Sequence, residues 1–117
     1  MNRNDLELAG QLAGAGASRI TDPKLRDCIL GKLNNNGIVK CGGGKCDKGQ
    51  KPDKNGKVLA GWAPIFGNTI HLCKGANGND FSLACTMIHE FGHTCHHPGE
   101  GAPDRAMNQA FPGLCPQ

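Results

Sequence analysis

Large aromatic side chains and long apolar runs are both scarce in this sequence. Its 117 residues include one Trp, four Phe and no Tyr, so a small core is expected. No apolar stretch approaches the roughly 18 residues of a membrane span. Segment 6–17 is too interrupted by polar residues and glycines to form the apolar part of a signal peptide. With a formal charge of +3 and no Lys/Arg run, nucleic acid is not an expected partner.

One pattern carries metal chemistry. His89 and His93 frame a His-Glu-x-x-His sequence in which Glu90 follows the first histidine. On an α-helix, side chains four residues apart leave the same face about 6 Å apart, so both imidazoles can reach one ion at about 2.0–2.1 Å. Glu90 projects about 100° further round the helix and can reach a metal-bound water without becoming a ligand. Two core histidines that bind no metal are the alternative interpretation.

The residues around this pattern predict a helix. Asn79 or Asp80 is a suitable N-cap, no Pro occurs from Phe81 to His97, and apolar residues recur at helical spacing. Gly92 lies between the two histidines, although Gly is unfavourable in a helix interior. A close approach of another backbone or of a substrate would explain its presence.

The pattern resembles the zinc-binding helix of the zincin metallopeptidases. The resemblance implies that His89 and His93 bind Zn²⁺, that Glu90 is the general base of peptide-bond hydrolysis, and that the substrate is a protein or peptide. It covers this helix and, loosely, the strand-rich segment before it, which zincins use to bind extended substrates by strand addition. The metzincin continuation is absent, because His96 and Gly99 stand where that group has Gly and its third His.

The third metal ligand is therefore open among four groups. Asp104 is the first candidate, because Pro103 can open a final helix over 104–111 that would aim it from a defined backbone. Glu100 also follows the turn and is the second candidate. His97 and His96 are the remaining ones, but a helical His97 would lie about 12 Å along the axis from the first ligand.

Stabilisation of a transition-state oxyanion must come from groups other than Tyr. The metal, a histidine or Arg105 could supply it. His71 lies in a predicted strand, where a partly exposed structural role is expected ahead of a catalytic one.

Seven cysteines and 18 glycines accompany the small number of aromatics. No two cysteines form Cys-x-x-Cys, so disulfides are expected in place of thiolate metal sites. Seven cysteines in a Gly-rich chain with few aromatics predict at least two disulfides, and the odd count leaves at least one free thiol. Cys41–Cys46 is the expected local pair, and Cys95–Cys115 is expected to tie the metal-binding helix to the tail.

The predicted fold is α+β: a compact zincin-like domain with a small antiparallel sheet packed on the metal-binding helix and braced by disulfides. Strands are expected at 38–41, 57–63 and 68–73, with a turn-rich loop at 42–57. Asp22-Pro23 predicts a helix start. Residues 1–20 are predicted to be a linker-like segment, with a weak helix at 5–13 and flexible residues at 14–18. Residues 21–117 are then the metallopeptidase domain.

The small size, the cysteines and the linker-like start resemble the C-terminal effector domains of bacterial polymorphic toxins. That resemblance implies a larger parent protein, delivery outside the producing cell and a cognate immunity protein as partner. One alternative is a disulfide-rich binding module in which zinc only holds the fold, with four protein ligands and a dispensable Glu90. Another is a secreted interaction domain whose histidines bind no metal.

Overall fold

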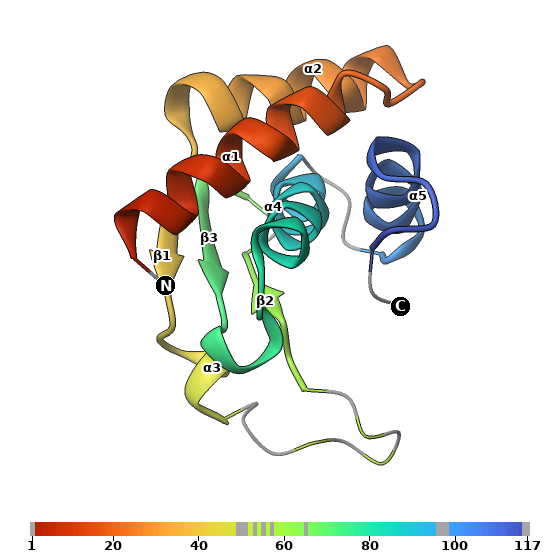
Figure 1. Ribbon diagram of the computed structural model, residues 1–117. Coiled ribbons are helices and arrows are strands. Elements are labelled where there is room, and N and C mark those ends of the chain that lie inside the picture. Colours follow the sequence, from red (N-terminus) through yellow and green to blue (C-terminus); the bar gives the residue numbers. More distant parts are fainter. Residues whose placement is uncertain are drawn as a thin grey trace.

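The fold places helix α4 between a small sheet and the other main helices (Figure 1). A computed structural model describes residues 2–48, 52, 54, 56, 58–64, 66–95 and 99–115. Its α-helices are α1 (Arg3–Ala17), α2 (Pro23–Gly31), α3 (Lys45–Lys48), α4 (Asp80–Thr94) and α5 (Gly101–Ala110), with a π-helical turn η1 (Lys32–Asn36) and a 3₁₀ turn η2 (Lys74–Ala76). Its strands are β1 (Ile38–Cys41), β2 (Gly61–Trp62) and β3 (Thr69–Leu72). The predicted α+β class is confirmed.

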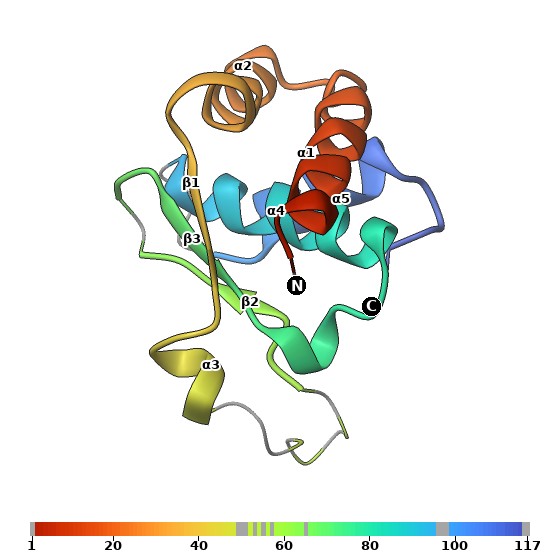
Figure 2. The same ribbon diagram turned by 60° about the vertical axis from the view of Figure 1, so that its left-hand side comes forward.

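The sheet is mixed, with strand order β1-β3-β2. Strand β2 pairs antiparallel with β3, as a short connection between neighbouring strands requires, whereas β1 runs parallel to β3. The prediction of an antiparallel sheet was therefore wrong for β1. A long segment separates β1 from β3 and lets the chain cross over before it re-enters the sheet. Strand β2 lies at an edge, beside α4 (Figure 2).

Helix α4 forms as its capping residues predict. The Asn79 side chain accepts a hydrogen bond from the Ser82 backbone N–H at 2.9 Å, which confirms the expected N-cap. A Cβ at Gly92 would lie 3.1 Å from Cα of Pro103. The glycine therefore lets α5 approach α4 closely, the kind of reason predicted for its place in the helix interior.

Residues 3–17 form a full helix in place of a linker with a flexible end. The cap is reciprocal, since Asn2 and Asp5 each accept a hydrogen bond from the other's backbone N–H. Small buried residues at Ala9, Ala13 and Ala17 recur every four positions and form one face of α1 in the core. Residues 14–17 continue the helix where a flexible segment was expected, and a Cβ at Gly16 would lie 2.6 Å from Cζ of Phe111, so this glycine allows close packing against the tail.

Several element boundaries also differ from expectation. Helix α5 begins at Gly101, ahead of the predicted 104–111, because Pro103 can occupy the first turn of a helix where no N–H bond is required. Among the described residues 58–63 of the expected strand at 57–63, the strand is Gly61–Trp62, and residue 57 lies outside the described residues. The described part of the expected 42–57 loop contains α3. The helix predicted from Asp22-Pro23 is confirmed as α2.

Three disulfides brace the fold: Cys28–Cys95, Cys46–Cys73 and Cys85–Cys115. The prediction of at least two disulfides is confirmed. The prediction of a free thiol is also confirmed, by the exposed Cys41. Both predicted pairings were wrong. Three successive glycines with positive φ, Gly42–Gly44, turn the chain so that α3 carries Cys46 to the end of β3. The tail after α5 reaches the middle of α4, and the helix end is joined to α2 instead.

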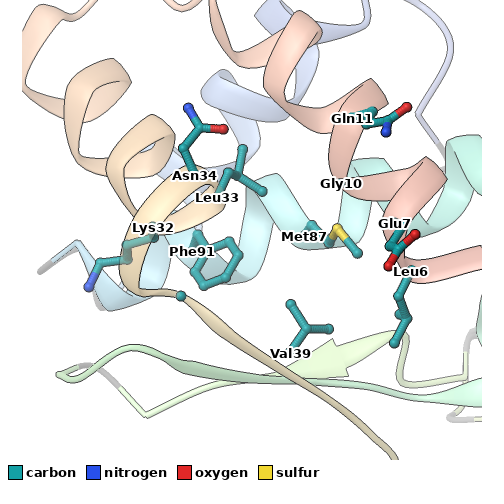
Figure 3. A pocket seen from close by; sticks show the side chains of 11 residues that line it. Leu6, Glu7, Gly10, Gln11, Lys32, Leu33, Asn34, Val39, Met87 and Phe91 are labelled. Atoms are coloured by element: carbon teal, nitrogen blue, oxygen red, sulfur yellow. The ribbon is translucent and has the colours of Figure 1, made fainter. Parts of the chain in front are cut away.

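A cavity of about 330 Å³ lies on the side of α4 that faces α1, η1 and β1 (Figure 3). Met87 and Phe91 of α4 line it together with Val39, Leu33 and Leu6. Among the described helices, none combines the length and the apolar character that crossing a bilayer would require.

Candidate metal centre

Two histidine side chains of α4 converge on the same point beside the helix. His89 and His93, one helical turn apart, bring their Nε2 atoms within 3.2 Å of each other, with ring planes inclined by 71°. Their side chains are mostly buried, at 17% and 12% exposure. Because α4 is held by packing along its length, the two imidazoles need little further ordering before they could share an ion.

Glu100 completes a triangle of donor atoms. It occupies the N-cap position of α5, and its two carboxylate oxygens lie 2.8 Å from Nε2 of His89 and 3.3 Å from Nε2 of His93. A tetrahedral ion with ligand distances of about 2.0–2.1 Å would separate its donors by about 3.3–3.4 Å. Of the three separations, the 3.3 Å one lies within that range, the 3.2 Å one is just below it and the 2.8 Å one is shorter, so a small adjustment of the Glu100 carboxylate would let this group hold a metal ion.

Asp104, predicted as the third ligand, lies outside this group. Its Oδ1 is 3.1 Å from Nδ1 of His89, the ring nitrogen that faces away from the donor triangle. A carboxylate there accepts the Nδ1–H bond, which leaves the Nε2 lone pair for a metal and fixes the ring. The geometry therefore favours Glu100, the second candidate, as the third ligand. Asp104 would instead orient the ring of His89. His96 and His97 lie outside the described residues.

Glu90 is buried beside the donor triangle, with 7% of its surface exposed. Burial, and after it the nearby Glu100 carboxylate, raise the pKa of its carboxyl from 4.5 to about 8 against a partial opposing effect of the Lys45 ammonium. The Cγ of Glu90 lies 3.2 Å from where a Cβ of Gly61 would be, so the side chain packs against the backbone of β2. Only glycine permits this approach.

The remaining predicted groups are less closely involved. The ring of His71 stacks on Trp62 at 4.0 Å between centroids, and its Nδ1 lies 3.0 Å from the Gly42 carbonyl oxygen. Those contacts fit the structural role expected for it. Arg105 is exposed on α5, near the backbone of Gly101.

Gly61 is a site residue that the sequence analysis did not identify. Glycine inside a strand often marks a place where another group comes close to the backbone. That signal was present in the predicted 57–63 strand and would have pointed to contact with the metal-binding helix.

Comparison with protein-family models, with curated proteins and with solved structures gave no match for this chain.

Proposed function

We propose that this domain is a zinc-dependent endopeptidase that acts on proteins or peptides. The supporting observation is the convergence of His89, His93 and Glu100 beside the buried Glu90. Two imidazoles and one carboxylate are a known ligand set of catalytic zinc sites, which keep a fourth position for water. An ion held there would supply Lewis acidity to a substrate carbonyl and lower the pKa of a coordinated water.

Glu90 is the group that would move the proton. It follows His89 in the chain but is not part of the donor triangle. As a carboxylate it would accept a proton from the attacking water and pass it to the leaving amine. A pKa raised by burial suits both steps, and the positive charge of a bound ion would lower that pKa again and favour the carboxylate.

The edge strand β2 offers the substrate a backbone partner next to Glu90. The Cys73 N–H donates to the Ala60 carbonyl at 2.8 Å, so Ala60 and Cys73 form a hydrogen-bonded pair. Gly61 then belongs to the following non-bonded pair, and its own N–H and C=O point away from β3. An extended peptide could bond to them and lie across the metal centre.

We extend the proposal to a role outside the reducing cytosol. Three disulfides fit an oxidising environment. Within this hypothesis the domain is a delivered toxin effector, and the producing cell would protect itself with an immunity protein.

The test is Glu90→Gln, which keeps the shape of the side chain but cannot accept a proton. With zinc present, cleavage of an unfolded protein substrate should fall by about 10²–10⁴-fold. Zinc affinity, measured by competition with a chelating dye, should stay close to that of the unmodified protein. Glu7→Gln is the matched control, because Glu7 is an exposed acid on α1 that pairs with Arg3.

Two results would reject the proposal. A zinc content near zero in folded protein would remove the metal centre altogether. Zinc binding with the same cleavage rate in Glu90→Gln would leave a structural zinc site and favour the binding-module alternative.

A further inference from the structure

A buried amide joins the edge strand to the metal-binding helix. Asn77 follows η2 and is 7% exposed. Its Nδ2 donates to the carbonyl oxygens of Ala60 at 2.7 Å and Cys73 at 2.9 Å, and its Oδ1 lies 2.9 Å from Oγ1 of Thr86 and 3.4 Å from Oγ of Ser82. The opposite orientation of the amide would set its oxygen against two carbonyls, so these partners fix how it points.

The partners of Asn77 are the immediate neighbours of the catalytic groups. Ala60 precedes Gly61 on β2, and Thr86 lies one helical turn before Glu90 on α4. A Cβ at Gly61 would meet Cγ2 of Thr86 at 2.8 Å and Cγ of Glu90 at 3.2 Å. Thr86 and Glu90 therefore lie on either side of Gly61, whose backbone N–H and C=O point away from β3.

We propose that Asn77 is a positioning residue that sets the distance between β2 and Glu90. It touches neither the proposed ligands nor the reacting atoms, and acts through Ala60, the residue before β2, and Thr86 on α4. This inference rests on the proposed peptidase function. Removing the Asn77 hydrogen bonds should leave the metal site intact but let β2 move away from α4. The scissile bond of a substrate paired with Gly61 would then lie at the wrong distance from Glu90.

The experiment compares Thr86→Val and Asn77→Ala with the unmodified protein. Thr86→Val keeps the volume of the side chain but removes the hydroxyl, and Thr86→Ser keeps the hydroxyl. A misplacement of about 1 Å can reduce a rate by about 10²-fold. For a blocked hexapeptide that can pair with β2, we expect kcat/KM to fall by about tenfold in Thr86→Val and about 10²-fold in Asn77→Ala. A blocked dipeptide should be affected much less, and zinc affinity should not change.

Two controls make the test specific. Thr94→Val removes another buried hydroxyl of α4, which among the described residues donates to the Phe91 carbonyl of the same helix, and should leave hexapeptide cleavage unchanged. Thr86→Ser should retain most of the activity. Hydrogen exchange of the Cys73 amide, which bonds to Ala60, should accelerate in Thr86→Val and Asn77→Ala but not in Thr94→Val.

The possible outcomes separate the two proposals. If the unmodified protein with zinc cleaves no peptide, the proposed function fails and this role fails with it. If the unmodified protein cleaves and Asn77→Ala, with zinc still bound, cleaves the hexapeptide equally well, only the positioning role is overturned. Equal losses for hexapeptide and dipeptide, or a loss of zinc, would also overturn it, because they would indicate general damage to α4.

Discussion

The two sides of helix α4 are built on different principles. The side toward α5 and β2 carries His89, Glu90 and His93, and each makes a specific polar or close backbone contact. The side toward α1 carries Met87 and Phe91, which pack among small apolar residues and border a cavity of about 330 Å³. Apolar packing can rearrange around a substituted side chain, whereas a metal-binding group loses its function when donor separations near 3 Å change. The effects of substitution on the two sides should therefore differ in kind.

The largest expected effect lies on the polar side. His93→Ala removes one donor of the triangle and should abolish zinc binding and cleavage together, because two remaining protein ligands are too few for a stable catalytic site. Equilibrium dialysis and the cleavage assay measure the two losses. Retention of one zinc per chain in this variant would mean that the ion binds elsewhere.

The second effect concerns the stability of the metal-free protein. The pKa of Glu90 is raised from 4.5 to about 8, so the folded state holds a proton that the unfolded state releases between these values. The free energy of unfolding should thus be highest below pH 4.5 and decline toward pH 8, by an amount on the order of a few kcal/mol. Urea titrations of Glu90→Gln, from which this contribution is absent, should show a flatter profile. Parallel profiles for the two proteins would contradict the assignment.

A third, smaller effect tests whether Asp104 binds the metal itself or only orients His89. Asp104→Asn removes the carboxylate that accepts from Nδ1 of His89 and should weaken zinc binding by about 10–100-fold without abolishing it. Asp27→Asn, which changes an exposed acid paired with Arg26, is the control. If Asp104→Asn loses zinc as completely as His93→Ala does, then Asp104 is itself a ligand, as the sequence analysis first predicted.

The smallest effect is expected on the apolar side. Met87→Leu nearly conserves volume next to the cavity, so it should change the free energy of unfolding by less than about 1.5 kcal/mol. Zinc affinity and cleavage rate should be unchanged. A loss of zinc in this variant would show that the two sides of α4 are not independent.

Local features were predictable from the sequence, because the residues that produce them are neighbours. The Asn79 cap, the Asp22-Pro23 helix start and the shared face of His89 and His93 follow from spacing alone. Long-range features were not. Glu100 and Asp104 could be named as candidates, but their ranking depends on where α5 docks against Gly92.

The disulfide pairing was hidden from the sequence for the same reason. Cys46 and Cys73 meet only once the glycine turn and β3 are in place. The role of α1 was missed because its alanines have the composition of a linker, and only their four-residue period within a helix turns them into a packing face.

The disulfides at Cys85 and Cys95 lie on α4 on either side of the histidine pair. They join the helix to the tail and to α2, so covalent bonds hold the segment that carries the candidate ligands on both sides. In small zinc domains without such bonds, metal binding and folding are a single event, and a chelator unfolds the chain. Here the disulfides would keep the scaffold folded with or without an ion, so any metal that the group binds would enter a preformed site.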